Sequence, residues 1–353
     1  MVERLRPRTT KGSSTRRLGG YYFSAPSVEF VPSGCTVLDC VLGGGWPLGR
    51  ISNIVGDKAV GKTLLAIEAC ANFHRKFPRG HIWYREAEAA FDVAYAEQLG
   101  LPARAVDFGP EGTNSIWDTI EDISEDLDKC LAAAEKSKQP GVYIVDSLDA
   151  VSSRAELARK AGEGTYGLEK QKQLGQMFRR LVRKLKHARV ALIVISQIRE
   201  NIGIRFGEKY KRVGGKSLDF YASQIMWLHH KKRVTSTVRG VERVVAVRVR
   251  AQCKKNKVGP AFRECEFVLR FGYGVDDLEA SLCWLKEVGA LMGAGISAKS
   301  AKDQDEKIRE LLRGNSKIDV DAAREQAAKI SDVVRAAWSE VEDRFRPPRR
   351  KYE

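Results

Sequence analysis

Residues 56–63 read Gly56-Asp-Lys-Ala-Val-Gly61-Lys62-Thr63 and match the pattern G-x-x-x-x-G-K-[ST]. The apolar run Ile51–Val55 before the motif is typical of a buried strand, and Leu64–Ala69 after it is typical of a helix. This arrangement indicates a phosphate-binding loop, because glycines let main-chain N–H groups turn towards phosphate oxygens and the helix N-terminus adds partial positive charge. We predict that the nucleotide is held by Gly56, Asp57, Lys58, Ala59, Val60, Gly61, Lys62, Thr63 and Leu64.

The end of this motif supplies a positive charge and a metal-binding hydroxyl. Lys62 is expected to face the outer phosphates, and the Thr63 hydroxyl is expected to bind Mg²⁺. A phosphate loop also needs a carboxylate near the metal, ideally at the end of another strand. Asp146 follows the apolar run Val142–Val145, so we predict that it acts on the metal through water.

Two acids follow the strand predicted at Gly80–Tyr84, and they are Glu86 and Glu88. Residues two apart point the same way on an extended chain. We expect one of them to face the γ-phosphate and to orient or deprotonate water. The other is expected to pair with Arg85 or with a helix N-terminus.

Apolar strands alternate with amphipathic helices between residues 30 and 275. Continuous apolar strands separated by helices favour an α/β fold with a mostly parallel sheet covered on both faces. Ligands of such sheets lie at the carboxyl ends of the strands. Strand-like runs at 224–229, 242–251 and 264–271 are expected to extend the sheet as antiparallel strands. A helix is predicted at 168–187, with a buried stripe of Phe178, Leu181, Val182 and Leu185.

The composition is that of a basic globular protein. The chain has 353 residues with 61 Lys+Arg against 45 Asp+Glu, a formal charge of +16, and 43% are hydrophobic. The sequence lacks both an apolar run of transmembrane length and a secretory signal, so we expect a cytosolic protein without membrane contact. Seven scattered cysteines without a Cys-x-x-Cys pair argue against a disulfide framework or a zinc site. The excess charge favours a polyanionic partner but also serves solubility.

Three parts are predicted along the chain. Residues 1–30 form a basic arm, because the first 20 residues carry six Arg or Lys against one acid with Ser, Thr and Gly between them. Residues 31–275 form the nucleotide-binding core, and residues 276–353 form a helical region with a basic tail.

The order of these motifs resembles the RecA recombinase family. The stretch Glu86-Ala-Glu88-Ala-Ala-Phe-Asp92-Val-Ala-Tyr95-Ala is similar to the family's Asp-Ala-Glu-His-Ala-Leu-Asp-Pro-x-Tyr-Ala. The resemblance implies a RecA-like P-loop NTPase core that uses ATP with Mg²⁺, with Glu88 as the catalytic carboxylate. Asp92 and Tyr95 would hold the adenine, the acid at its amino group and the ring by stacking. Gln197 would sense the γ-phosphate and relay it to an adjoining DNA-binding loop.

Two segments rich in glycine and basic residues resemble the family's DNA-binding loops. The first runs from Glu156 to Leu168 and the second from Ile198 to Lys216. Basic side chains would neutralise phosphates in any sequence, and aromatic or apolar ones would wedge between bases. An ordinary surface loop with incidental charge is the alternative. The predicted DNA contacts are Tyr166, Gly167, Arg199, Ile202, Gly203, Arg205, Phe206, Lys209, Lys211, Arg212, Gly214, Gly215 and Lys216.

The helix between these segments has a basic face, which in most proteins is only solvated. The resemblance assigns a DNA contact to Arg179 and, more weakly, to Lys172.

Lys254-Lys255-Asn256-Lys257 resembles the family's Lys-Asn-Lys motif, although a plain basic turn is the alternative. By this resemblance Lys255 and Lys257 reach the ATP of a neighbouring subunit and act like arginine fingers. Such head-to-tail contacts give open helical filaments. The segment 11–19 resembles the family's docking strand. The short arm and the basic end differ from bacterial members, which suggests a bacteriophage recombinase of the UvsX type.

We therefore expect a DNA-dependent ATPase that polymerises on single-stranded DNA and pairs it with a homologous duplex. Single-strand-binding and loader proteins are the expected partners, and the cytoplasm of a bacterium or a phage-infected host is the expected location. Two alternatives remain open, which are a hexameric DNA helicase of the same fold and a non-catalytic recombination mediator.

Overall fold

The structure is a computed structural model that describes residues 28–88, 90–109, 117–158, 168–200, 210–212, 215–297, 303, 306–307 and 320–348. At 168, 199–200, 210–212, 215, 320–321 and 323 only the backbone is described. Within the described ranges, helices that combine bilayer-spanning length with enough apolar character are absent.

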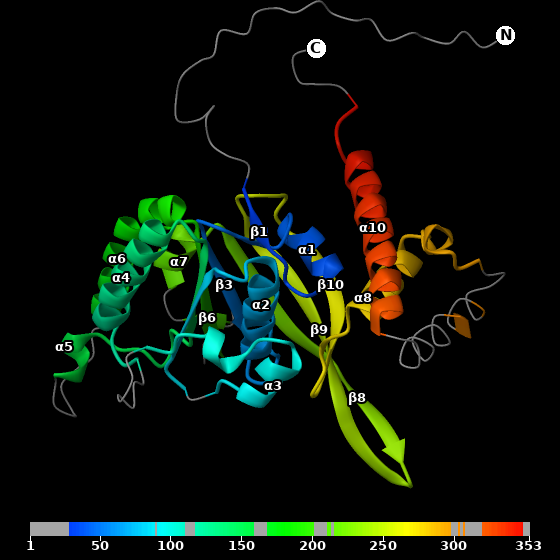
Figure 1. Cartoon of the computed structure of the whole chain (residues 1–353), viewed down its shortest axis with the longest axis horizontal. Helices are drawn as coiled ribbons and strands as arrows, with labels where there is room; N and C mark the ends of the chain where they lie inside the picture. The colour runs from blue at the N-terminus through cyan, green and yellow to red at the C-terminus, as the bar shows by residue number, and fades with distance from the viewer. Residues whose placement is uncertain are drawn as a thin grey trace, which may run out of the picture.

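A nine-stranded sheet forms the centre of the molecule (Figure 1). The strand order is β11-β10-β9-β8-β3-β6-β5-β4, and β7 pairs with β6. β3, β4, β5, β6 and the start of β8 run parallel, whereas β9 and β10 are antiparallel additions. The strands are β3 (Ile51–Gly56), β4 (His81–Glu86), β5 (Gly141–Asp146), β6 (Val190–Glu200), β7 (Tyr210–Arg212), β8 (Gln224–Val238), β9 (Val241–Asn256), β10 (Arg263–Arg270) and β11 (Gly274–Val275), with a separate pair of β1 (Phe30–Val31) and β2 (Trp46–Pro47).

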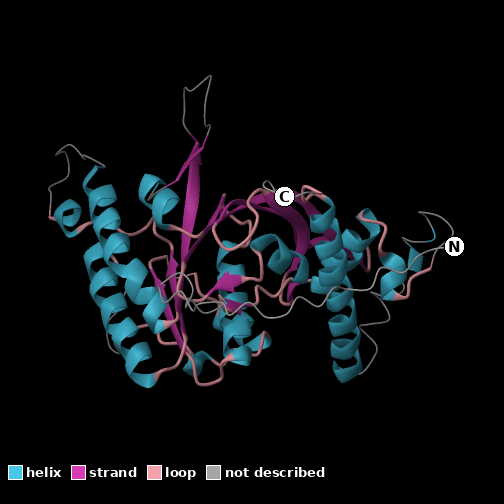
Figure 2. Cartoon of the chain, turned by 90° about the horizontal axis from the view of Figure 1, so that it is seen from above, coloured by secondary structure: helices cyan, strands magenta, loops and turns pink. Residues whose placement is uncertain are grey.

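Helices cover both faces of the sheet (Figure 2). Ile54 of β3 packs into one core with α2, while Ile51 and Val55 pack into a second core with α4 and α6. The alternation follows from the two-residue period of a strand and explains why the strand is apolar on both sides. The helices are α1 (Thr36–Leu42), α2 (Lys62–Lys76), α3 (Val93–Gln98), α4 (Ile120–Ser137), α5 (Arg154–Leu157), α6 (Leu168–Ala188), α7 (Gly215–Tyr221), α8 (Asp277–Glu287) and α10 (Val320–Arg344), with short 3₁₀ turns η1 (Ala103–Ala105) and η2 (Leu291–Ala294).

The predicted α/β sheet is confirmed. In the predicted stripe of α6, Phe178, Leu181 and Leu185 are fully buried and Val182 is partly buried. The strand beginning at Gln224 was expected to be antiparallel. This is wrong on the side where β8 meets β3, because these two strands pair in parallel. The chain passes through α7 between β6 and β8. This crossover returns the chain to the end of the sheet where β3 and β6 begin, so β8 can run parallel to them.

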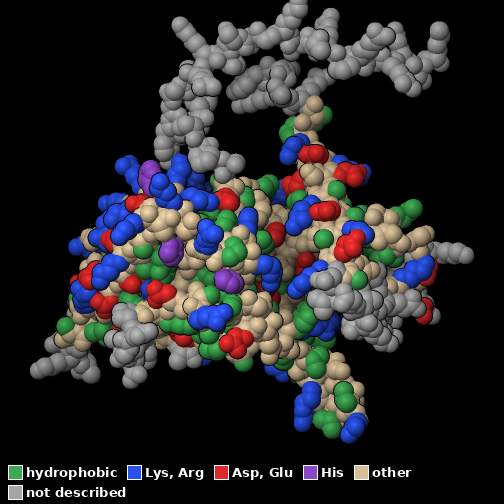
Figure 3. Space-filling view, viewed as in Figure 1, with side chains coloured by type: hydrophobic (Ala, Val, Ile, Leu, Met, Phe, Trp, Pro, Cys, Tyr) green, Lys and Arg blue, Asp and Glu red, His purple; other side chains and the backbone are tan. Residues whose placement is uncertain are grey.

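The outer halves of β8 and β9 form a ribbon that projects beyond the sheet (Figure 1). Arg239 and Gly240 close it with φ values of 51° and 78°, which is the left-handed geometry that a tight hairpin turn of type I′ requires. The tip carries basic and apolar side chains side by side (Figure 3), and Val238 is 67% exposed.

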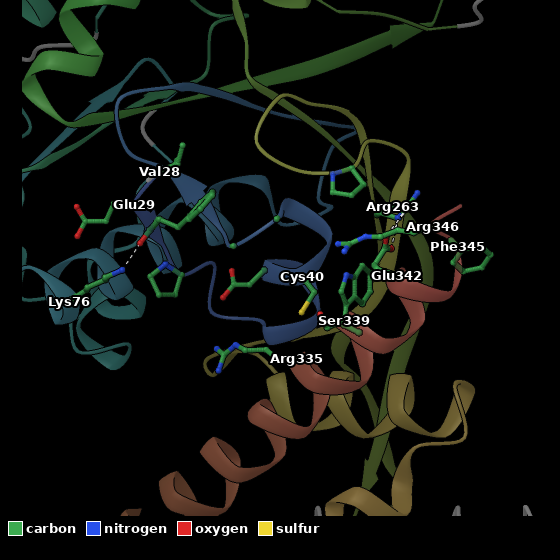
Figure 4. A pocket seen from close by; sticks show the side chains of 17 residues that line it. Val28, Glu29, Cys40, Lys76, Arg263, Arg335, Ser339, Glu342, Phe345 and Arg346 are labelled. Carbon is green, nitrogen blue, oxygen red and sulfur yellow. Dashed lines mark hydrogen bonds and ion pairs between the residues drawn. The ribbon is translucent and has the colours of Figure 1, made fainter. Parts of the chain in front are cut away.

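The C-terminal helices pack against the core. Trp284 of α8 and Trp338 of α10 lie 5.3 Å apart between ring centroids. Arg263 of β10 holds Glu342 of α10 through two bonds of 2.6 and 2.7 Å. A cleft of about 1170 Å³ lies between α10, α1 and the chain near β1 (Figure 4). Between α8 and α10 along the chain, Leu291 of η2 is buried.

Candidate functional site

The phosphate loop lies between the carboxyl end of β3 and the first turn of α2. Gly61 precedes the helix with φ of +86°, and a Cβ there would stand 2.1 Å from Cδ1 of Leu269. Both the backbone conformation and the lack of space therefore require glycine. A cavity of about 1130 Å³ opens at this loop, and its lining includes Asp57, Lys58, Ala59, Val60, Gly61, Lys62, Thr63, Leu64, Glu88, Asp92, Asp146, Ser147 and Gln197.

Lys62, Thr63 and Asp146 meet at the base of this cavity. Nζ of Lys62 donates to the Asp57 carbonyl at 2.6 Å, and the Thr63 hydroxyl donates to Oδ2 of Asp146 at 2.8 Å. Burial raises the pKa of Asp146, and hydrogen bonds from Tyr84 and Thr63 oppose the rise. Burial lowers the pKa of Lys62, against the attraction of Asp146 and other nearby acids. Hydroxyl and carboxylate oxygens beside a lysine and a helix N-terminus are a donor set that fits Mg²⁺ and phosphates.

Glu88 and Gln197 are joined by hydrogen bonds at the mouth of the cavity. Nε2 of Gln197 donates to both carboxylate oxygens of Glu88, at 3.0 and 3.2 Å. The Ser147 hydroxyl also donates to Glu88. The structure thus brings the exposed carboxylate that follows β4 into contact with a side-chain amide of β6.

Glu86 and Arg85 have other partners than those expected. Glu86 accepts the main-chain N–H groups of Ala90 and Phe91, the second at 2.5 Å. Arg85 is buried and pairs instead with Asp126 at 2.6 Å and with Asp107 at 3.2 Å. Consecutive residues of a strand point to opposite faces, so Arg85 and Glu86 cannot pair across β4.

Asp92 lines the cavity and caps α3, where its Oδ1 accepts the N–H of Tyr95 at 2.9 Å. The Tyr95 side chain is only 4% exposed and is absent from the described lining of the cavity. Its hydroxyl faces the region of Glu68 and Gly274. Stacking of Tyr95 on an adenine stays a prediction, and it would require the ring to leave this buried position.

The predicted DNA contacts whose side chains are described lie on α6 and α7. Lys172 and Arg179 are exposed on α6, and Lys216 is exposed on α7. Nε of Arg179 donates to the Tyr221 hydroxyl at 3.2 Å, which ties the two helices. The backbone of Arg199 pairs with that of Lys211. The second basic segment therefore begins and continues in two paired antiparallel strands, the end of β6 and β7. The side chains of Arg199, Lys211 and Arg212 are not described, and Gly215 is the first residue of α7. The other predicted DNA contacts lie outside the described residues: Tyr166, Gly167, Ile202, Gly203, Arg205, Phe206, Lys209 and Gly214.

Lys255 and Lys257 lie at the opposite edge of the sheet from the phosphate loop. Asn256 between them pairs with Gln224, whereas Gly56 at the loop pairs with Leu228. Four residues along a strand span about 13 Å. Nζ of Lys255 and Nζ of Lys257 donate to the Phe220 carbonyl at 3.1 and 3.2 Å. Neither lysine is near the cavity of its own chain, so a role at a nucleotide requires a second subunit.

Some hydrogen-bond partners of the predicted site residues were not predicted. Tyr84 is fully buried and donates its hydroxyl to Oδ2 of Asp146 at 2.7 Å. Ser147 bonds to Glu88, and Asp149 accepts the N–H of Gln197 at 2.6 Å. The position of Ser147 directly after Asp146 was a usable signal. The other two contacts join segments distant in the sequence, and a single sequence carries no sign of them.

Comparisons with known proteins agree with this arrangement. A family model described as the RecA N-terminal domain matches residues 8–276. Protein RecA of Bifidobacterium breve is 32% identical over 313 residues, which is 87% of this chain and 75% of that protein. Protein RecA of Porphyromonas gingivalis is 30% identical over 315 residues, 87% of this chain and 86% of that protein. Protein RecA of Streptomyces ambofaciens is 30% identical over 310 residues, with 88% and 79% covered. The chain therefore belongs to the RecA family.

Proposed function

We propose that this chain is an ATP-dependent DNA strand-exchange protein that forms helical filaments on single-stranded DNA and hydrolyses ATP in a DNA-dependent way. One observation carries the proposal, which is the contact between Glu88 at the phosphate site and Gln197 at the root of the second basic segment. This contact gives the nucleotide site a direct connection to a DNA-binding element. Residues 1–30, 31–275 and 276–353 would serve as polymerisation arm, catalytic core and helical accessory region.

The chain's own groups divide the work of hydrolysis. Loop N–H groups and Lys62 hold the phosphates, and Glu88 accepts a proton from the attacking water or orients it. Thr63 and Asp146 would hold Mg²⁺, which when bound neutralises charge on the outer phosphate oxygens. A γ-phosphate competes with Glu88 for the Gln197 amide. When the Gln197 amide moves from Glu88 to the γ-phosphate, the position of the end of β6 changes. The second basic segment continues from that end.

The shared nucleotide site supports assembly. Lys255 and Lys257 lie on the sheet edge that faces away from the phosphate loop, so one copy can present them to the next copy in a head-to-tail stack. A closed hexameric helicase could use the same contact, and its products would be rings with directional unwinding. A mediator would bind nucleotide without turnover. The presence of Glu88, Gln197, Lys255 and Lys257 argues against it.

Turnover and assembly can be tested together. We expect single-stranded DNA to stimulate ATP hydrolysis and a non-hydrolysable ATP analogue to give helical filaments by electron microscopy. Glu88→Gln should lower turnover by at least about 100-fold while leaving nucleotide-dependent DNA binding intact. Equal turnover in Glu88→Gln would remove this residue from its role, and closed rings would favour the helicase.

The setting of this reaction is also a proposal. A recombinase of this kind would act in the cytoplasm of a bacterium or a phage-infected host, on homologous double-stranded DNA. Single-strand-binding and loader proteins would be its partners there.

A further inference from the structure

Asp149 joins two segments at the edge of the nucleotide site. It lies after β5, and its Oδ2 accepts the main-chain N–H of Gln197 at 2.6 Å. One residue earlier, the N–H of Leu148 donates to the Ile195 carbonyl at 3.0 Å. The segment after β5 is therefore attached to β6 at two adjacent points.

The carboxylate takes the place of a missing strand partner. The last paired residues of β5 and β6 are Val145 and Val194, so β5 supplies no ladder acceptor at Gln197. An N–H donor at this position needs another acceptor, and a charged one makes a short, strong hydrogen bond. The distance of 2.6 Å is slightly shorter than the usual 2.7–3.2 Å for an N–H donor.

Asp149 also lies within the electrostatic field of the phosphate site. Together with Asp146 and Glu88 it raises the pKa of Lys62, in opposition to the larger effect of burial. The Gln197 main chain is thus held by one acid of the site, while its side chain donates to another, Glu88.

We propose that Asp149 is a positioning residue that fixes the Gln197 main chain, so that the side-chain amide can reach Glu88 or a γ-phosphate. This inference rests on the proposed function. The segment that contains Asp149 continues through α5 towards the first basic segment, and Gln197 leads into the second. One hydrogen bond therefore connects the roots of both segments that we propose to bind DNA.

Two substitutions separate the hydrogen-bond acceptor from the charge. Asp149→Ala removes the acceptor, whereas Asp149→Asn keeps an oxygen that can accept the N–H of Gln197. For Asp149→Ala we expect the DNA-stimulated kcat to fall at least about ten-fold, equivalent to about 1.4 kcal/mol in the barrier, with KM for ATP changed less than about two-fold. Asp149→Asn should stay within about three-fold of the wild type in both quantities.

A control variant tests for general effects of losing an acid. Asp128 on α4 pairs with Lys184 at 2.7 Å and lies outside the described cavity lining. Asp128→Ala should leave kcat, KM and the ATP-dependent gain in DNA affinity unchanged. If Asp149→Ala does not fold, Asp149→Ser replaces it, because the shorter serine side chain cannot reach the N–H of Gln197. Thermal unfolding and ADP binding verify the fold of each variant.

Wild-type kcat in Asp149→Ala, or in Asp149→Ser where Ala does not fold, would overturn the inference. Equal losses in the Ala and Asn variants would also overturn it, because charge alone would then explain the effect. A wild-type protein without nucleotide-dependent DNA binding would overturn the proposed function and this inference together. An active wild type beside an equally active acceptor-free variant would overturn the inference alone.

Discussion

Tyr84→Phe removes one hydroxyl beside the carboxylate that we propose acts on Mg²⁺. Tyr84 is 0% exposed, and its hydroxyl donates to Oδ2 of Asp146 at 2.7 Å. Phenylalanine fits the same space, so the change deletes a hydrogen bond to a charged group, worth about 1.5–3 kcal/mol of unfolding free energy. Changes to groups that orient a metal ligand commonly cost 10–100-fold in metal affinity. We expect the Mg²⁺ concentration for half-maximal nucleotide binding to rise about ten-fold.

The pH dependence should shift in a defined direction. The Tyr84 hydrogen bond lowers the pKa of Asp146, in opposition to burial. Removing that bond raises the pKa of Asp146 further, so Mg²⁺-dependent binding should be lost at a higher pH as the solution is acidified. Binding of a fluorescent ADP, titrated with Mg²⁺ between about pH 5 and 8, measures both effects.

Tyr143→Phe is the matched control for this experiment. Tyr143 is also fully buried, and its hydroxyl donates to Asp126 at the same distance of 2.7 Å. It should lower the unfolding free energy by a similar amount without changing the Mg²⁺ requirement. Equal Mg²⁺ requirements in Tyr84→Phe and the wild type would refute the reasoning, as would an equal shift in both variants.

Three further predictions follow from single features. Gly61→Ala should abolish nucleotide binding. Gly100→Ala, at a position with φ of +79° but open space around it, should cost only about 1 kcal/mol of unfolding free energy and leave nucleotide binding intact. Equal nucleotide affinities of the two variants would contradict this prediction. Burial raises the pKa of Asp39 to about 7, so the folded state holds a proton that the unfolded state loses above about pH 4. The unfolding free energy of the wild type therefore falls as the pH rises from about 4 to 7, and urea unfolding should show a flatter pH profile for Asp39→Asn. Parallel profiles of the two proteins would contradict this prediction. Lys62→Ala and Lys255→Ala should each be inactive, yet an equal mixture should recover about a quarter of the wild-type DNA-stimulated ATPase rate, because a quarter of random interfaces pair two intact halves; no recovery would argue against a shared site.

The phosphate loop and the order of the main strands could be predicted because their signals are local. Gly56 to Thr63 is a contiguous motif between an apolar strand and a helix, and each parallel strand is a continuous apolar run. The roles of Glu88 and Gln197 were predicted from the resemblance alone. The contact between the two side chains arises because the carboxyl ends of parallel strands lie at one edge of the sheet.

The remaining contacts depend on the three-dimensional arrangement. Arg85 looked like a partner for Glu86, yet the alternation of β4 sends it to the opposite face, where it meets Asp126. The direction of β8 depends on the crossover through α7 rather than on its own residues. Tyr95 carries the motif's aromatic ring, but the packing of α3 buries it.

The affinity for single-stranded DNA in different nucleotide states tests the central claim most directly. Fluorescence anisotropy with a labelled oligonucleotide would compare the wild type and Gln197→Ala with a non-hydrolysable ATP analogue, with ADP and without nucleotide, at one salt concentration. We predict that the analogue strengthens wild-type binding at least about ten-fold over ADP and that Gln197→Ala loses most of this gain. Equal wild-type affinity in all three conditions would contradict the account.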